Sequence, residues 1–375
     1  MNTTVCLLAN TLYYPDGGGG HQWAFLNWAL GLRAAGCRVI WMEAVRPDEP
    51  AHEVQALVAH LKGRLARYGL ADTVALCPWT SEPLLPGSVH GCLDLDDASE
   101  ADLLLNLAPS VPAAVVGRFR RSAFLDIDPG LTQVWMAQGL KVARHSLYFT
   151  IGEGVGQPGA LFPDHGLVWH HTPPPVCLQA WPVAPADSGA PYTSVTHWGD
   201  SWIEFEGQVY PNGKREGFLP YLDLPRHSRS GLELAAYLED FEHERELLLA
   251  YGWRVRDSHE VAATPWSYQA YLQSARGEFS CAKPFYVRLQ STWVSDRTVC
   301  FLASGKPAIV QHTGPSRFLP DAEGLFRFRN LDEAVKAMSS ADADYAHHCV
   351  AARRLAEEHF DARRVVARVL ERALG

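Results

Sequence analysis

Residues 291–314, STWVSDRTVCFLASGKPAIVQHTG, predict a helix that leads into a buried strand through a tight turn. Ser295 and Asp296 stand where a helix cap belongs, and apolar residues follow them at helical spacing. Gly305 is expected to end this helix, because glycine adopts the left-handed conformation of a helix C-terminus without strain. Residues 307–311, PAIVQ, then form a short apolar run that suits a strand of a parallel sheet.

The start of this helix is a candidate phosphate site. The first N–H groups of a helix have no partner within the helix, and the helix dipole adds partial positive charge there. Arg297 lies in the first turn and carries a full positive charge. We therefore expect an anionic group of a ligand to bind at this point.

The amino-terminal part of the sequence alternates between strand and helix patterns. Residues 4–10, TVCLLAN, and 37–45, CRVIWMEAV, are apolar runs typical of strands that are buried on both faces. Residues 23–36, WAFLNWALGLRAAG, carry apolar side chains on a helical period. The alternation continues to about residue 153 and predicts an α/β domain with a doubly wound parallel sheet.

A crossing between two domains is expected at residues 166–191, which are rich in proline and glycine and show almost no helical period. This divides the chain into an amino-terminal domain, 1–165, and a carboxyl-terminal domain, 192–360. The second domain again alternates between strands and helices, and residues 230–238, SGLELAAYL, are expected to form one of its helices.

Part of the pattern of a dinucleotide site is present in the first domain. A glycine run at residues 17–20 precedes a helix, and Glu43 lies near the end of the second strand. The true fingerprint needs three glycines at GxGxxG spacing, the third of which lets the helix pack against the strand. Here the third position holds Gln22 or Trp23, and both side chains are bulky. The sequence therefore disfavours a dinucleotide-dependent oxidoreductase, although this function stays open.

Composition restricts the class of protein further. A chain of 375 residues with 47% hydrophobic content can build two domains with proper cores. A net charge of −9 argues against nonspecific nucleic-acid binding. Eight dispersed cysteines, no leader-like N-terminus and no apolar stretch of ~20 residues predict a soluble protein of the cytoplasm. His170 and His171 have no further ligands at a recognisable spacing, so no metal site is expected.

Three segments resemble glycosyltransferases of the GT-B fold, of the kind grouped in families 1 and 4. They are residues 295–307, SDRTVCFLASGKP, residues 17–43, GGGGHQWAFLNWALGLRAAGCRVIWME, and residues 351–361, AARRLAEEHFD. The resemblance implies two Rossmann-like domains that face each other across a cleft. It also implies that the last helix, residues 361–375, returns to the first domain.

The resemblance further implies transfer of a sugar from a nucleotide diphosphate sugar to a hydroxyl group of a small-molecule or glycan acceptor. Neither a metal nor a cofactor other than this donor is expected. His21 occupies the place of the general base in inverting members, and an imidazole with a pKa near ~6.5 can accept a hydroxyl proton. Asp126 and Asp128 follow a predicted strand and are the candidates for orienting this histidine.

Donor contacts are expected at ten positions: Gly18, Gly19, Gly20, His197, Lys214, Lys283, Arg288, Ser295, Asp296 and Arg297. One departure from the pattern is informative, because Cys300 stands where many retaining members carry a glutamate. Asp296, one helical turn earlier, could bind the donor ribose instead, and the stereochemistry of transfer stays open. The same two-domain frame would also suit a sugar-nucleotide epimerase or hydrolase, or a non-catalytic sugar-binding protein.

Overall fold

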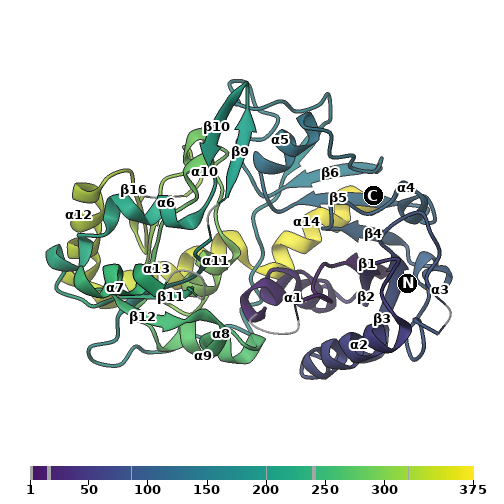
Figure 1. Ribbon diagram of the computed structural model, residues 1–375, viewed down its shortest axis with the longest axis horizontal. Helices are drawn as coiled ribbons and strands as arrows, with labels where there is room; N and C mark the ends of the chain where they lie inside the picture. The colour runs from purple at the N-terminus through teal and green to yellow at the C-terminus, as the bar shows by residue number, and fades with distance from the viewer. Residues whose placement is uncertain (1–2, 15–17, 86, 200, 239–241, 320) are drawn as a thin grey trace. The chain divides into compact units, whose positions relative to one another are not determined.

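The computed structural model describes these residues: 3–14, 18–85, 87–199, 201–238, 242–319 and 321–375. The chain divides into two compact units, each with one large sheet (Figure 1). The first unit contains residues 1–158, 162–177 and 362–375, and the second contains residues 159–161 and 178–361. The expected α/β class with two Rossmann-like sheets is confirmed.

The first sheet has seven strands, all parallel, in the order β3-β2-β1-β4-β5-β6-β7. Its strands are β1 (Thr4–Leu8), β2 (Arg38–Val45), β3 (Val74–Pro78), β4 (Leu103–Asn106), β5 (Ser122–Asp126), β6 (Leu147–Thr150) and β7 (Trp169–His171). The helices of this unit are α1 (Gly19–Ala34), α2 (Ala51–Ala66), η1 (Ala71–Thr73), α3 (Leu95–Ser99), α4 (Ala113–Val116), α5 (Leu131–Ala137) and α14 (Ala362–Leu374). The strand order reverses between β1 and β4, which is where ligands bind in open α/β sheets.

The last helix, α14, packs on α1 of the first unit, as Figure 1 shows for the yellow and purple ends of the chain. Gly31 of α1 makes the close approach possible, since a Cβ there would lie 2.8 Å from Ala362 Cβ and 2.9 Å from Val366 Cγ2. The backbone N–H of Ala362 also donates to the carbonyl of Val176 at 3.0 Å, so α14 begins beside the segment that follows β7.

The second sheet also has seven strands, in the order β12-β11-β8-β13-β14-β16-β15, and only the edge strand β15 is antiparallel to its neighbour. They are β8 (Tyr192–His197), β11 (Leu232–Tyr237), β12 (Arg254–Asp257), β13 (Gly277–Ser280), β14 (Ala308–Gln311), β15 (Ala322–Glu323) and β16 (Leu325–Phe328). The order reverses between β8 and β13, which defines a second switch point.

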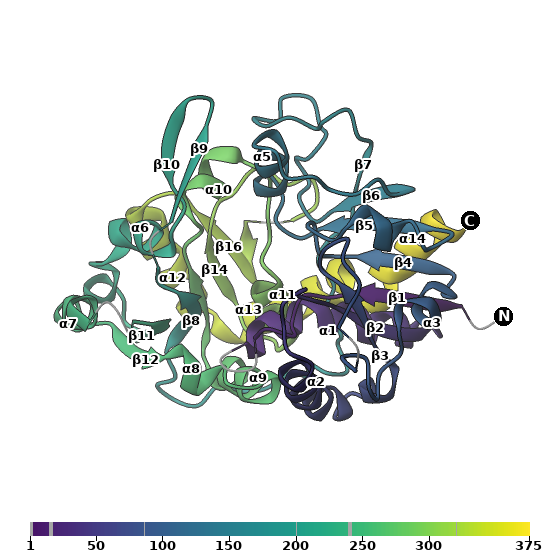
Figure 2. The same ribbon diagram turned by 45° about the vertical axis from the view of Figure 1, so that its right-hand side comes forward.

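Helices and a separate hairpin complete the second unit. Strands β9 (Trp202–Phe205) and β10 (Gln208–Pro211) form an antiparallel pair that projects beyond the sheet (Figures 1 and 2). The helices are α6 (Lys214–Phe218), η2 (Leu219–Tyr221), η3 (Leu224–His227), α7 (Glu242–Ala250), α8 (Ser258–Val261), α9 (Pro265–Ser274), α10 (Pro284–Leu289), α11 (Asp296–Ala303), α12 (Leu331–Ala343), α13 (Tyr345–Leu355) and η4 (Ala356–Phe360).

Strand β11, Leu232–Tyr237, occupies most of residues 230–238, so the helix expected there is wrong. Leucine and alanine, which make up much of this segment, are strong helix formers and favour a helix by local propensity. β11 lies between β8 and β12, and Leu232 and Leu234 alternate with Glu233 to bury one face of the strand. Tertiary pairing therefore overrides local helix propensity here.

The segment 166–191, expected as an interdomain crossing, contributes β7 to the first sheet before the boundary between the units at residues 177 and 178. No helix within the described ranges combines the length and the apolar character that a membrane span requires.

Candidate functional site in the second unit

Helix α11 begins at the carboxyl edge of the second sheet. Ser295 is its N-cap, and its hydroxyl accepts a hydrogen bond from the N–H of Arg297 at 3.2 Å. Thr313 Oγ1, in the loop after β14, donates to the carbonyl of Trp293 at 2.6 Å and holds the segment that leads into the helix. Gly305 follows the helix with φ +69°, the left-handed conformation predicted from the sequence.

Arg297 connects α11 to the sheet. Its Nε donates to Glu278 Oε1 of β13 at 2.8 Å, and its Nη1 donates to the carbonyl of Val195 in β8 at 2.8 Å. Glu278 is fully buried, so the carboxylate compensates the guanidinium in a region with little water. The structure thus places Arg297 beneath the switch point between β8 and β13, where it fixes the sheet to the helix.

Lys214 brings a second cation to the same place. Its Nζ donates to the carbonyl of Cys281, just after β13, at 2.6 Å. Burial is the main cause that lowers the pKa of Lys214 to about 7, and the positive charges of Arg297 and Lys283 act in the same direction. A pKa near 7 leaves Lys214 only partly protonated at neutral pH, so its charge depends on what binds beside it.

Glycine at position 217 allows this arrangement, because a Cβ there would lie 2.2 Å from the carbonyl oxygen of Ala282. The close approach seats α6, which begins at Lys214, against the loop that follows β13. Lys283 ends that loop as the N-cap residue of α10. We refer to Lys214, Lys283 and the N-terminus of α11 as the cationic cluster.

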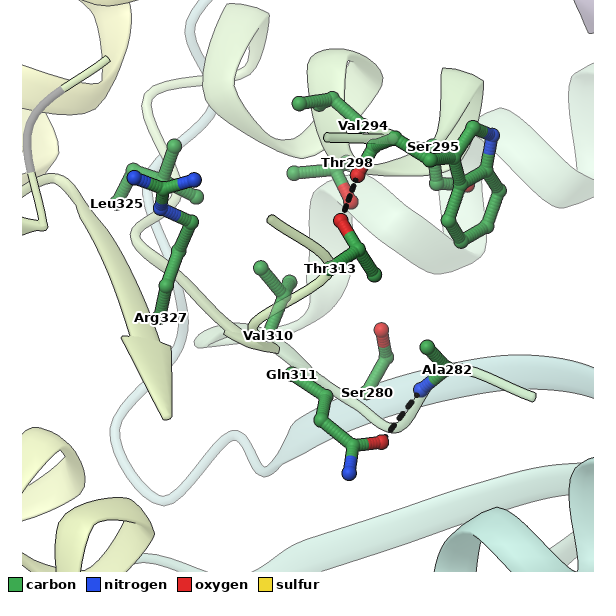
Figure 3. Close-up of a pocket in the computed structure, with 11 residues that line it drawn as sticks. Ser280, Ala282, Val294, Ser295, Thr298, Val310, Gln311, Thr313, Leu325 and Arg327 are labelled. Carbon is green, nitrogen blue, oxygen red and sulfur yellow. Dashed lines mark hydrogen bonds between the residues drawn. The ribbon is translucent and has the colours of Figure 1, made fainter. Parts of the chain in front are cut away.

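A small pocket lies between β13, β14 and the start of α11 (Figure 3). Its volume of about 20 Å³ is room for one water molecule. Polar side chains of Ser280, Thr298 and Thr313 are among those that line it. Gln311 Oε1 accepts from the N–H of Ala282 at 3.0 Å, as the dashed line in Figure 3 shows, and this bond fixes the loop after β13.

Three other expected donor residues are placed as follows. Arg288, on α10, is exposed and lies over the ring of Tyr210 with its Cζ 4.6 Å from the ring centroid. His197, at the end of β8, is exposed, and its ring stacks on Tyr237 with centroids 6.4 Å apart. Asp296 is the first residue of α11.

Candidate functional site in the first unit

His21 lies in the first turn of α1, next to the switch point of the first sheet. Its Nε2 is 2.6 Å from the carbonyl oxygen of Asn10, in the loop after β1. Because a carbonyl can only accept, Nε2 carries the proton, and Nδ1 of the neutral ring has the lone pair. The ring packs against Tyr14 and Phe25 with centroids 4.4 and 5.2 Å away.

The pKa of His21 is lowered by burial, while the hydrogen bond to Asn10 and the charge of Asp128 oppose that change. Neutral imidazole is therefore the form that the surroundings favour. Asp128 supplies negative charge that would stabilise the ring if it accepted a proton.

The carboxylate of Asp126 accepts hydrogen bonds from the turn and the helix that follow β5 and from β6. Its carboxylate accepts hydrogen bonds from Thr132 Oγ1 at 2.7 Å, Gln133 Nε2 at 3.0 Å and Thr150 Oγ1 at 2.9 Å. It also accepts from the N–H of Asp128 at 3.0 Å. Burial raises its pKa to about 6. These bonds fix the β5–α5 turn, which carries Asp128, so Asp126 positions the turn.

The three glycines expected to contact the donor belong to this unit. Gly18 is the N-cap residue of α1, and a Cβ there would lie 2.8 Å from the carbonyl oxygen of Tyr14. Gly19 and Gly20 form the first turn of the helix, where backbone N–H groups have no helical partner. Gly17 lies outside the described residues.

Sequence reasoning missed Glu43 as a positioning residue. Its buried carboxylate accepts from the N–H groups of Thr11 and Leu12 at 2.8 and 3.2 Å and from Trp41 Nε1 at 2.8 Å, and the hydroxyl of Thr11 also donates to it. The start of the loop after β1, at Thr11 and Leu12, is therefore anchored to β2. The sequence offered one sign of this role, because Glu43 is a single carboxylate within a largely apolar strand and a buried carboxylate needs hydrogen-bond partners.

The described residues contain no group of three or more histidine, cysteine, aspartate or glutamate side chains that could hold a metal ion. His170 is engaged with Arg372 of α14, whose Nη1 lies 3.0 Å from its Nδ1.

Comparison with known proteins

No protein-family profile matches this sequence. A search of curated proteins likewise finds no match. Similarity is found among solved structures. HepE of Anabaena, in a complex with UDP-glucose, matches with a TM-score of 0.57 and 13% identity over 99% of both chains.

Two further solved structures are similar to this chain over almost its whole length. The sucrose-phosphate synthase of Thermosynechococcus elongatus matches with a TM-score of 0.55 and 11% identity, covering 100% of this chain and 99% of the other. A glycosyltransferase of avilamycin A biosynthesis matches with a TM-score of 0.53 and 14% identity, covering 99% and 97%. At these identities the likeness establishes the fold, which is that of the GT-B glycosyltransferases, over the whole chain.

Proposed function

We propose that this protein is a glycosyltransferase that moves a sugar from a nucleotide diphosphate sugar to a hydroxyl acceptor. The observation that carries the proposal is the cationic cluster at the switch point of the second sheet, in a chain that shares its fold from end to end with sugar transferases. The solved HepE complex contains UDP-glucose, which makes a UDP-sugar the first donor to test.

The cationic cluster would hold the donor diphosphate. Lys214 and Lys283 supply positive charge, and the N-terminus of α11 supplies N–H groups. When the bond between the sugar and the diphosphate breaks, the leaving oxygen gains negative charge, and fixed cations nearby stabilise it. We propose that these groups take the place that a metal ion has in other sugar transferases. Arg297 contributes by keeping α11 attached to β13 and β8.

His21 of the first unit would be the general base. Nε2–H is held by the carbonyl of Asn10, so Nδ1 is the atom that accepts the acceptor's hydroxyl proton. The acceptor oxygen then bonds to the anomeric carbon, the bond to the diphosphate breaks, and the nucleoside diphosphate leaves. Asp128 would stabilise the imidazolium that forms.

The test is binding and turnover measured on the same variants. UDP, GDP, TDP, ADP, CMP and NAD are titrated by calorimetry, and Lys214→Gln is expected to weaken the preferred diphosphate at least tenfold. Lys336→Gln, an exposed lysine on α12 of the same unit, is the matched control and should bind like the wild type.

His21→Asn should keep nucleotide affinity and lose sugar transfer. Binding of NAD alone would contradict the proposal in favour of an oxidoreductase. Rapid consumption of the sugar nucleotide without any acceptor would instead favour a hydrolase or an epimerase, which would share the donor site.

A further inference from the structure

A second pocket lies at the edge of the second sheet where its parallel strands begin, opposite the edge that carries the cationic cluster. Its volume is about 600 Å³, within the range of small-molecule sites. Residues that precede or start four strands line it: Ala190 before β8, Gly231 before β11, Arg254 at the start of β12 and Arg276 before β13. We refer to it as the basal pocket.

Three arginines and one aspartate give the basal pocket its charge. Arg276 Nε donates to Asp342 Oδ1 at 2.7 Å, and the guanidinium lies 3.9 Å from the ring centroid of Tyr345. The other carboxylate oxygen of Asp342 accepts from Ser230 Oγ at 2.7 Å. Asp342 is therefore engaged with Arg276 and Ser230, and this ion pair forms a neutral wall of the pocket.

The other two arginines, Arg229 and Arg254, are exposed at the pocket and take part in no ion pair between described residues. The guanidinium of Arg254 lies against Gly231, where a Cβ would be 3.2 Å from Arg254 Cζ. Glycine at 231 thus leaves room for the guanidinium at this position. Two positive charges without an ion-pair partner among the described residues stand together in a protein whose net charge is −9.

We propose that the basal pocket binds a small phosphate monoester, such as a sugar phosphate. The planar guanidinium forms paired hydrogen bonds with phosphate oxygens, and two of them suit one phosphate group. The C-terminal part of α12 contributes Ser339 and Asp342 to the pocket. The negative end of the α12 dipole points here as well, so any attraction for a phosphate must come from the arginine side chains. Because α/β sheets bind their main ligand at the carboxyl ends of the strands, this would be a separate site, independent of the proposed function.

Calorimetric titration of the full chain with glucose 6-phosphate and with inorganic phosphate tests the proposal. The wild type should show saturable binding, and the double variant Arg229→Gln/Arg254→Gln should weaken it at least tenfold. Arg256→Gln is the control, since Arg256 lies on the same strand, is paired with Glu260 and does not line the pocket. Lys214→Gln, in the cationic cluster, should leave this binding unchanged.

Each outcome bears on the proposal. Stronger binding of glucose 6-phosphate than of phosphate would support it and show that the sugar is also recognised, while equal binding would support a phosphate site alone. Binding that survives the double variant, or that is lost in Lys214→Gln, would overturn it, as would no binding at millimolar concentration. The unfolding temperature of the double variant confirms that it folds, and Arg254→Gln alone replaces it if it does not.

Discussion

Lys214 illustrates how burial and neighbouring cations set the protonation of a single residue. Burial is the main cause that lowers its pKa to about 7, and Arg297 and Lys283 repel its charge. A diphosphate bound at the cationic cluster would add negative charge and favour the protonated lysine, so binding and proton uptake are linked. Binding of the donor diphosphate would therefore itself promote the protonation of Lys214, and the protonated lysine would in turn bind the diphosphate more strongly.

We expect the affinity for UDP to fall as pH rises from 7 to 9. Below the pKa of the free site, near 7, Lys214 is already protonated and binding has its full strength. Above it, the ligand must bind together with a proton, and the phosphates of UDP are already ionised in this range. Calorimetry at several pH values checks this, and Lys214→Arg should flatten the profile because arginine stays charged. An unchanged slope in that variant would contradict the assignment.

At the scale of elements, the contact between α1 and α14 depends on one residue without a side chain. Gly31 brings the two helices close enough for Ala362 and Val366 to pack on it. Glycine within a helix ordinarily costs about 0.5–1 kcal/mol relative to alanine, so close packing is the physical reason for it here.

Gly31→Ala should lower the free energy of unfolding by about 1–3 kcal/mol, because the added methyl overlaps the α14 side chains. Gly63→Ala is the matched control: Gly63 is an exposed helical glycine of α2 with no atom within 4 Å of the added Cβ. The free energy of unfolding of that variant should rise by about 0.5–1 kcal/mol. Urea unfolding measures both, and a stabilised Gly31→Ala variant would rule out the close packing.

At the scale of the whole molecule, the two units differ in how the chain builds them. Nearly all of the second unit is one continuous segment, residues 178–361. The first unit needs residues 362–375 from the far end of the chain, because α14 covers α1. Folding of the first unit therefore depends on residues that follow the whole second unit in the sequence.

We expect residues 178–361 to fold as an isolated fragment with a cooperative thermal transition. Residues 1–177 alone should lack a cooperative thermal transition, because α14 is then absent and no longer covers the face of α1 around Gly31. A short glycine–serine linker from residue 177 to residue 362 should restore it, since Ala362 N lies 3.0 Å from the carbonyl of Val176. Circular dichroism melts compare the three chains; cooperative melting of residues 1–177 without α14 would refute this account.

The sequence by itself determined the α/β class, the helix from Ser295 to Gly305 and the strand after it. These features follow from local chemistry, namely apolar periodicity, a capping hydroxyl and a glycine with positive φ. Two candidate site residues were also named at this level, His21 through the resemblance to GT-B glycosyltransferases and Lys214 in the turn at residues 210–218, and their roles stay predictions.

Only the tertiary structure decided what each of these side chains contacts. Residues 232–237 form a strand because β8 and β12 pair with them, and this pairing outweighs the local helix propensity of the segment. Arg297 is joined to Glu278, 19 positions earlier, and Asp126 is enclosed by its own turn. The pairing of distant residues depends on the packing of whole elements, so a single sequence places chemical groups at an edge of a sheet without specifying their partners.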